Sequence, residues 1–261
     1  MDWWSSLLLG AVQGLTEPLP VSSSAHLLLL HNWLGGVGES LTFDTALHLG
    51  TALSIFVFFY RDWRSLAREI FLPNPAVFKK IGRILAAVIP VGVVGVFWGD
   101  ALEGFFRSSF WAAPALLFGS IVMLFSQYFS RVKFNLRDWP MSKAFSVGLA
   151  QVLALIPGVS RSGITVSAGL LAGLGKEDSF LFSFMNGGIL TLLAGSWSLV
   201  KTTRIVGTVS LLEMLPGMAA AFVFGLLGLF LFKRFFWKFG WVPFIIYRIL
   251  LAVVVFGSII R

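Results

Sequence analysis

The chain is dominated by long apolar runs that are separated by short polar segments. Six of these runs are long enough to cross a lipid bilayer, whose hydrocarbon core requires roughly 20 mostly apolar residues in a helix. Water is absent from that core, so backbone N–H and C=O groups must be paired internally, and a helix pairs them within one segment. The pattern therefore predicts an all-α, polytopic membrane protein with six transmembrane helices. These predicted spans cover about 41–60, 81–99, 109–129, 179–200, 214–232 and 241–260.

Four further apolar runs are too short to cross, and they come in two pairs. They lie at about 3–16, 24–37, 144–156 and 163–175. A break rich in proline and serine joins the two runs of each pair, PLPVSSS in the first and PGVSRSG in the second. A short helix, a break and a second short helix are typical of a re-entrant hairpin, which enters the membrane and returns to the same side. We therefore expect two re-entrant helical hairpins.

The two breaks also resemble each other in sequence. AVQGLTEPLPVSSSAHLL (11–28) and LAQVLALIPGVSRSGITV (149–166) align without a gap. We interpret the chain as a single membrane domain with internal repeat halves at about 1–133 and 138–261, each with one hairpin and three spans. An odd number of spans turns the second half upside down, which is the inverted-topology repeat of many transporters. The aligned polar positions pair Gln13 with Gln151, Ser22 with Ser160 and Ser24 with Ser162.

Composition supports a membrane protein and excludes several other classes. Apolar residues make up 57% of the chain and charged residues 12%, whereas soluble globular chains contain about 25% charged residues. There are no cysteines, which excludes disulfides and thiolate chemistry. The net charge of +8 does not indicate nucleic-acid binding, because the basic residues lie in short loops between apolar runs. The N-terminus, MDWWSSLLLG, has no basic segment, so we expect no cleaved signal peptide.

The distribution of basic residues predicts the orientation. If segment 61–83 is cytoplasmic, then 131–143, 176–178 and 233–238 lie on the same side, and these segments hold most of the lysines and arginines. Cytoplasmic loops carry such an excess. The first hairpin then enters from outside and the second from the cytoplasm, so that their tips meet inside the membrane. The basic loop residues on the opposite side are Arg107, Lys201, Arg204 and Arg261.

Charged and polar residues gather at the two breaks. Glu17 lies at the first break and Arg161 at the second, and intramembrane charges are usually functional or paired. Pro20 and Pro157 end one helix of each hairpin, and the serines that follow are good N-caps for the next helix. Two helix N-termini would then face one cavity, which favours an anion, and Arg161 adds a bidentate phosphate donor. The surrounding polar residues are Gln13, Ser22, Ser23, Ser24, His26, Ser160, Ser162 and Thr165.

Some of these residues also allow a purely structural interpretation. Hydroxyl groups in membrane helices often cap or bridge helices, which applies to Ser24, Ser162 and Thr165. Glu17 and Arg161 could form a structural bridge between the halves.

Four polar residues farther along the chain have no single assignment. His31 follows a leucine run and is expected at the membrane interface. Asp44 and His48 either line the mouth of the cavity or only cap a helix. Arg248 lies inside the last apolar run, where it either snorkels to the interface or pairs with an acid.

At QGLTEPLPVSSSAH and PGVSRSGIT the sequence resembles the undecaprenyl-diphosphate phosphatases, the bacitracin-resistance family of bacterial membranes. The resemblance extends to PFIIYR at 243–248 and so spans nearly the whole chain. Two departures are visible: Gln13 stands where a carboxylate is frequent, and SSSAH replaces the more familiar Ser-Ser-Thr-Gly-His. The first signature corresponds here to Gln13, Glu17, Ser22, Ser23 and His26, and the second to Pro157, Gly158, Ser160, Arg161, Ser162 and Thr165.

The resemblance implies an enzyme that hydrolyses a C55 isoprenyl diphosphate to the monophosphate and inorganic phosphate. This reaction recycles the lipid carrier for cell-wall polymers and confers resistance to bacitracin. The family is similar in fold to inverted-repeat transporters and uses a divalent cation, Mg²⁺ or else Ca²⁺. It works at the outer face of the bacterial inner membrane. The oligomeric state is left open, with a homodimer among the options.

The residues suggest roles, and several alternatives stay open. Arg161 is expected to bind phosphate oxygens together with Ser22, Ser160, Ser162 and Thr165. Glu17 either holds the metal, with Gln13 as a second candidate ligand, or acts as general base. Ser23 is the preferred nucleophile, with His26 or Glu17 taking its proton. The rival assignments make His26 the nucleophile or let Glu17 activate water.

Two other functions compete with a phosphatase of this family. A lipid or anion transporter, or a flippase, would use the same inverted-repeat fold. A Ser–His pair beside a phosphate-binding arginine favours an enzyme, since an ion-coupled carrier does not need one. A phosphatase of the acid-phosphatase-like lipid superfamily is disfavoured, because SRSGITVSAG has no histidine at the required place.

Overall fold

The computed structural model describes residues 3–34, 41–72, 75–106, 108–206 and 211–258, and nearly all of them are helical. The first half contains α1 (Trp3–Thr16), α2 (Ser23–Trp33), α3 (Leu41–Phe58), α4 (Tyr60–Ile70), α5 (Pro75–Phe106) and α6 (Ser109–Phe129). The second contains α7 (Met141–Val152), a short 3₁₀ turn (Leu153–Leu155), α8 (Arg161–Leu171), α9 (Lys176–Val206), α10 (Leu211–Phe239) and α11 (Val242–Gly257).

Four of the described helices are long and apolar enough to cross a membrane: α5, α6, α9 and α10. The other two predicted spans are also helices, but their apolar stretches are shorter, at Ala46–Phe58 in α3 and Val242–Gly257 in α11. Large apolar side chains point outward from the bundle, among them Phe97, Ile121 and Val253. Such a surface suits lipid rather than water, which confirms the predicted all-α, polytopic membrane fold.

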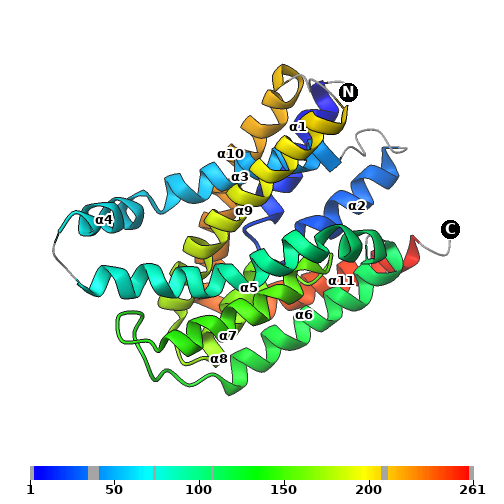
Figure 1. Ribbon diagram of the computed structural model, residues 1–261. Coiled ribbons are helices and arrows are strands. Elements are labelled where there is room, and N and C mark those ends of the chain that lie inside the picture. The colour runs from blue at the N-terminus through cyan, green and yellow to red at the C-terminus, as the bar shows by residue number, and fades with distance from the viewer. Residues whose placement is uncertain (1–2, 35–40, 73–74, 107, 207–210, 259–261) are drawn as a thin grey trace.

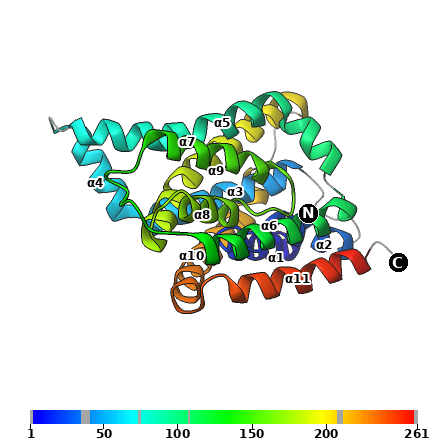
Figure 2. The ribbon, with the colours of Figure 1, turned by 90° about the horizontal axis from the view of Figure 1, so that it is seen from below.

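The helices form two layers. One layer follows the order α5, α7, α8, α6, α11, in which each helix packs against the next (Figure 2). The other follows the order α9, α3, α10, α1. Contacts of α8 and α5 with α9, and of α2 with α1 and α6, join the layers. Each of the four short helices of the two predicted hairpins packs against at least one long helix: α1 against α10, α2 against α6, α7 against α5, and α8 against α6 and α9 (Figure 1).

In the layer that contains α9, α3, α10 and α1, glycine residues allow α1 to approach α10 closely. A Cβ atom on Gly10 would collide with the main chain of Gly217, and one on Gly14 with that of Ala221. Both contacts join α1 to α10, so the spacing of these two glycines serves helix packing. Gly173 differs, because it follows α8 with a φ of 99° and so lets the chain turn there.

The segment 61–83, expected as a loop, contains two helical parts. α4 is an amphipathic helix that exposes Arg61, Arg64 and Arg68 and buries Leu66. α5 begins at Pro75, well before the apolar run. The loop interpretation was wrong because these turns are too polar to resemble a span, yet a polar helix packed on one face is stable.

The ends of the molecule can be compared with the charge pattern. α4 lies at the opposite end from the start of α1 and the end of α11 in both views (Figures 1 and 2). Of the basic residues predicted on the terminal side, Arg107 and Arg261 lie outside the described residues, as does the end of the predicted second short helix beyond Leu34.

Candidate active site at the two helix breaks

Each predicted hairpin is broken where proline and serine occur. The first break separates the end of α1 at Thr16 from the start of α2 at Ser23. The second break separates the end of the 3₁₀ turn at Leu155 from the start of α8 at Arg161. The residues before α2 and α8 are Ser22 and Ser160, and both have positive φ angles, of 71° and 75°. Non-glycine residues rarely adopt this conformation, and it is concentrated at functional sites. The two aligned serines therefore share the same unusual backbone.

The expected N-capping holds for only one of these serines. Ser160 Oγ accepts a hydrogen bond from the Gly163 N–H at 3.4 Å, so this side chain caps α8. Ser22 makes no capping bond to α2, and its hydroxyl instead lies 3.0 Å from that of Ser24. The prediction that both serines are caps was therefore wrong for Ser22, because a neighbouring hydroxyl takes its hydrogen bond.

The Glu17 carboxylate lies between the two breaks. Its Oε2 atom accepts a hydrogen bond from Ser23 Oγ at 2.6 Å, and a longer one from Gln13 Nε2 at 3.4 Å. Its Oε1 atom accepts one from Arg161 Nη2 at 3.0 Å. Residues 144 positions apart are thus joined by a charge-assisted hydrogen bond. The structure brings together Glu17, Ser23 and Arg161, as the sequence predicted.

Arg161 retains hydrogen-bonding capacity. Its Nη2 atom also donates to Thr191 Oγ1 at 3.2 Å, and its guanidinium lies 5.9 Å from the centre of the Phe184 ring. A side chain at Gly187 would collide with the guanidinium, so this glycine provides the space for it. Nη1 is buried and has no hydrogen-bond partner among the described residues. A buried cationic donor without a partner is a ready place for an anionic oxygen.

The remaining serine and threonine candidates make internal hydrogen bonds. Ser162 Oγ donates to Leu19 O at 3.2 Å and thereby links the second break to the first. Thr165 Oγ1 donates to Arg161 O at 2.7 Å and also contacts Ser183 Oγ. Ser24 Oγ accepts from the Gly158 N–H at 3.2 Å. Ser24 and Ser162 therefore hold the two breaks together, and Thr165 joins α8 to α9, which is the structural role that the sequence left open for these three hydroxyls.

His26 points away from Ser23 and toward α11. Its Nδ1 atom lies 2.7 Å from Ser22 O, and a carbonyl oxygen only accepts, so Nδ1 carries the proton and donates. Nε2 is then an acceptor, and it lies 2.7 Å from the hydroxyl of Tyr247. The rings of His26 and Tyr247 are also stacked. Of the two bases considered for Ser23, the geometry therefore favours Glu17.

Arg248 was not assignable from the sequence, and both proposed roles were wrong. Its side chain is completely buried, so it does not snorkel, and no acidic side chain among the described residues contacts it. It donates instead to main-chain carbonyls of the first break and the second break, and to α6. Main-chain carbonyls can satisfy a guanidinium because it has five N–H donors and no acceptor. The acceptors are Pro20 O, Gly158 O, Val159 O, Ala115 O, Leu116 O and Ser120 Oγ, at 2.8 to 3.4 Å.

We expect Arg248→Lys to destabilise both breaks. A lysine ammonium is a single point of charge and cannot reach carbonyls from three segments at once. Leaving two buried carbonyls unpaired should lower the free energy of unfolding by about 2–4 kcal/mol. Thermal unfolding of the detergent-solubilised protein, followed by tryptophan fluorescence, measures this. Arg64→Lys, on the exposed face of α4, is the control, and equal melting temperatures for both variants would contradict the assignment.

Two of the open residues bridge α2 and α3. His31 Nε2 lies 3.0 Å from Asp44 Oδ1, and both side chains are buried. His31, expected at the membrane interface, is buried within the protein, because an acidic partner on α3 allows the imidazole to be buried.

His48 lies at the site itself rather than capping a helix. Its Nδ1 atom is 2.9 Å from Gln13 Nε2 and 3.8 Å from Glu17 Oε2. Among the described residues, no group of three or more His, Cys, Asp and Glu side chains forms a metal site. Any cation held near Glu17 would therefore need an amide or hydroxyl oxygen as well.

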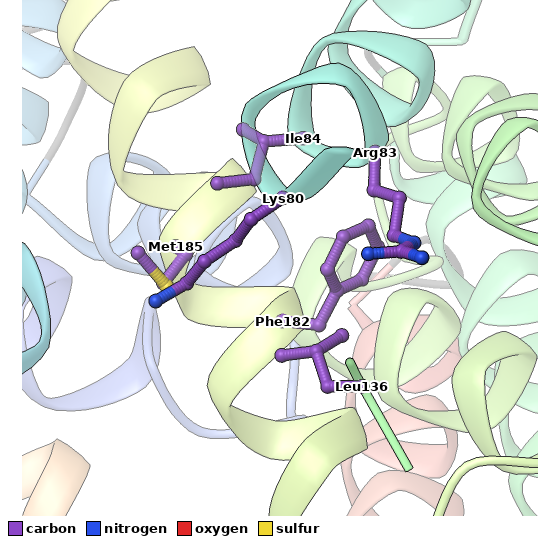
Figure 3. A pocket seen from close by; sticks show the side chains of 6 residues that line it. All are labelled: Lys80, Arg83, Ile84, Leu136, Phe182 and Met185. Atoms are coloured by element: carbon purple, nitrogen blue, oxygen red, sulfur yellow. The ribbon is translucent and has the colours of Figure 1, made fainter. Parts of the chain in front are cut away.

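A small pocket elsewhere in the molecule does not belong to this site. Lys80, Arg83, Ile84, Leu136, Phe182 and Met185 line it (Figure 3). Its two basic side chains diverge: the Lys80 ammonium points toward Met185, and Arg83 Nε donates to Trp139 O. None of the lining residues belongs to either break, and the two charges do not converge on a common point.

Comparison with known proteins gives one consistent result. The sequence model of the family described as bacitracin resistance protein BacA matches residues 6–254. The undecaprenyl-diphosphatase of Gemmatimonas aurantiaca is 36% identical, over 99% of this chain and 98% of its own. Those of Alcanivorax borkumensis and Rubrobacter xylanophilus are 38% and 37% identical, each over at least 97% of both chains. The chain therefore belongs to the bacitracin resistance protein BacA family.

Proposed function

We propose that this protein is an integral membrane phosphatase that hydrolyses undecaprenyl diphosphate to undecaprenyl phosphate and inorganic phosphate. This reaction would recycle the lipid carrier for cell-wall polymers and so confer resistance to bacitracin. The observation that carries the proposal is the cluster of Glu17, Ser23 and Arg161, in which the first break supplies a carboxylate and a hydroxyl and the second supplies a guanidinium. Relatives similar over the whole chain bear the name undecaprenyl-diphosphatase.

Arg161 and the start of α8 suit the diphosphate. The substrate is a multiply charged anion, so positioning it and neutralising its charge make up most of the catalytic task. Nη1 of Arg161 is free to donate, and Arg161 is the first residue of α8, where N–H groups point out of the helix. A phosphate group bound there would lie next to the Ser23 hydroxyl, because both side chains contact the Glu17 carboxylate.

Ser23 is the nucleophile that the geometry supports best. Its hydroxyl donates to Glu17 Oε2 at 2.6 Å, so the carboxylate is placed to take the proton as Oγ attacks the terminal phosphorus. The bond from phosphorus to the bridging oxygen breaks, and the prenyl monophosphate leaves. The leaving monophosphate takes the proton from Glu17, which regenerates the carboxylate. Water then releases phosphate from Ser23, with Glu17 again as base. Direct activation of water by Glu17 is the rival mechanism.

His26 is less suited to either chemical role. Both of its ring nitrogens are engaged, with Ser22 O and the Tyr247 hydroxyl. We propose that it orients the start of α2, where Ser23 is the first helical residue. Its contact with Tyr247 also connects that helix to α11.

We propose a divalent cation, Mg²⁺ or Ca²⁺, as cofactor, with Glu17 and Gln13 as the residues that would hold it. The residues fit, because Gln13 is completely buried and its Oε1 atom has no hydrogen-bond partner among the described residues. Carboxylate and amide oxygens are the ligands that these cations prefer. The cation would supply positive charge to offset that of the diphosphate.

The proposed setting is the bacterial inner membrane, with the site open to the outer face. The excess of basic residues supports a cytoplasmic position for the end that carries α4. The matching sequences of the two breaks, and the positive φ angles of Ser22 and Ser160, support two halves of inverted topology.

Phosphate release by the purified protein tests the function. The detergent-solubilised protein, without any ion gradient, is expected to release phosphate from undecaprenyl diphosphate, and EDTA is expected to abolish the release until Mg²⁺ or Ca²⁺ is restored. A carrier would bind or move the lipid without hydrolysing it. Binding with no phosphate release in the presence of either cation would therefore contradict the proposal.

A further inference from the structure

Three electron-pair donors from two helices lie close together on one side of Glu17. They are the Gln13 amide in the last turn of α1, Glu17 Oε2 directly after that helix, and Nδ1 of His48 in the middle of α3. The side chain of His48 is about one-third exposed, whereas Gln13 is buried. The imidazole therefore closes the open side of a buried polar pair.

The spacing of these groups suits a shared cation. The Gln13 amide nitrogen is 2.9 Å from His48 Nδ1 and 3.4 Å from Glu17 Oε2, and Nδ1 is 3.8 Å from Oε2. Two ligands at right angles around a cation, each about 2.1 Å from it, lie about 3 Å apart. The first two separations are near this value, and a small movement of the His48 ring would bring the third one close to it.

The Gln13 amide provides an independent sign that a partner is missing. Its NH₂ group faces the two acceptors, His48 Nδ1 and Glu17 Oε2, while its buried Oε1 atom has no partner. Buried amide oxygens are rarely left unsatisfied. Half a turn of the amide would exchange its two ends and direct the oxygen to the point that Glu17 and His48 also face. With the proton of His48 on Nε2, that rotation is favourable only when a cation occupies the point, because three electron-pair donors would otherwise repel one another.

The helices that carry the three groups are held firmly. Gly14 packs directly on Ala221 of α10, and Leu47 and Thr51, on either side of His48, are completely buried in α3. The approach of His48 to Gln13 is therefore set by helix packing rather than by a mobile side chain alone.

We propose that His48 Nδ1, Glu17 Oε2 and the Gln13 amide oxygen together bind a divalent cation, with His48 as the third protein ligand. This inference rests on the proposed phosphatase function and its need for a cation. Arg161 contacts the other carboxylate oxygen, Oε1, so the guanidinium and the cation would lie on opposite sides of Glu17.

An imidazole ligand has a consequence for metal choice. Nitrogen ligands favour Mn²⁺ and later transition metals over Mg²⁺ and Ca²⁺, which prefer oxygen. The site should accordingly bind Mn²⁺ at least as tightly as Mg²⁺. His48→Gln would replace the nitrogen by an amide oxygen and shift the preference back toward Mg²⁺.

Electron spin echo spectroscopy of bound Mn²⁺ tests the proposal, because a directly bound imidazole nitrogen modulates the manganese echo. The protein contains only three histidines, so single substitutions identify the source. The protein is purified with an affinity tag that lacks histidine and studied with Mn²⁺ alone. We expect nitrogen modulation in the wild-type protein, in His26→Asn and in His31→Asn, and its loss in His48→Gln. We also expect at least about tenfold weaker Mn²⁺ binding in His48→Gln.

Other outcomes would overturn the proposal. These are an absence of Mn²⁺ binding, bound Mn²⁺ without nitrogen modulation, or modulation that disappears in His26→Asn instead. Thermal unfolding curves show that each variant is folded, and Gln13→Leu provides a second variant, in which Mn²⁺ affinity should fall while the nitrogen modulation remains. Failure of the proposed function would be seen separately, as a wild-type protein that binds Mn²⁺ through His48 but releases no phosphate.

Discussion

Arg161→Ala is expected to lower kcat/KM for phosphate release by about 10²–10³-fold. Arg161 is the one cationic side chain in the cluster with Glu17 and Ser23, and its Nη1 atom is buried without a partner among the described residues. Alanine would remove this donor and leave the Glu17 carboxylate without its cationic neighbour. The anionic substrate would then bind next to an uncompensated negative charge.

Two comparison variants separate charge from geometry. Arg161→Lys keeps the charge but provides no planar fork, so its activity should lie between those of the wild type and alanine variants. Arg64→Ala, on the exposed face of α4, removes an arginine from another part of the protein and should retain normal turnover. The measurement is steady-state phosphate release in detergent. Near-normal activity of Arg161→Ala would remove the basis for the site assignment.

The fold was largely predictable because bilayer crossing requires long apolar helices. The predicted spans and short runs all correspond to helices of the structure. α4 was missed because it lies outside the apolar runs, and its pattern of Arg61, Arg64 and Arg68 is that of a helix with one exposed polar face. The span criterion detects hydrophobicity, whereas α4 is stabilised by packing Leu66 on the core.

The site was predictable where charge or repetition identified it. Glu17 and Arg161 are ionisable residues within apolar segments, and the aligned breaks placed them together. The partner of Ser23 was not predictable. The sequence left His26 and Glu17 as alternatives, and it could not separate them because Glu17 is reached across the break, where the backbone direction changes. Arg248 could not be assigned, because main-chain carbonyls bind it and residue types do not reveal where these carbonyls are exposed.

Ser23→Ala is expected to reduce turnover by on the order of 10³-fold or more, as the loss of a nucleophile does. The hydroxyl makes a short bond to Glu17, and no other serine or threonine is observed to donate to this carboxylate among the described residues. Substrate binding should change little, because Arg161 remains. Rapid quenching of the wild-type reaction should also reveal phosphate attached to Ser23, detectable by mass spectrometry of the peptide that contains it.

Ser24→Ala is the matched control for this variant, since Ser24 is the next residue in α2 and does not contact Glu17. Its hydroxyl accepts from Gly158 N–H, and losing that bond should lower activity by about tenfold at most. If Ser23→Ala releases phosphate at the wild-type rate, serine is not the nucleophile, and water activated by Glu17 becomes the mechanism that the geometry supports. Glu17→Gln should lower turnover by either route, because both require the carboxylate as base, whereas phosphate attached to Ser23 in the wild-type reaction is expected only from the serine route.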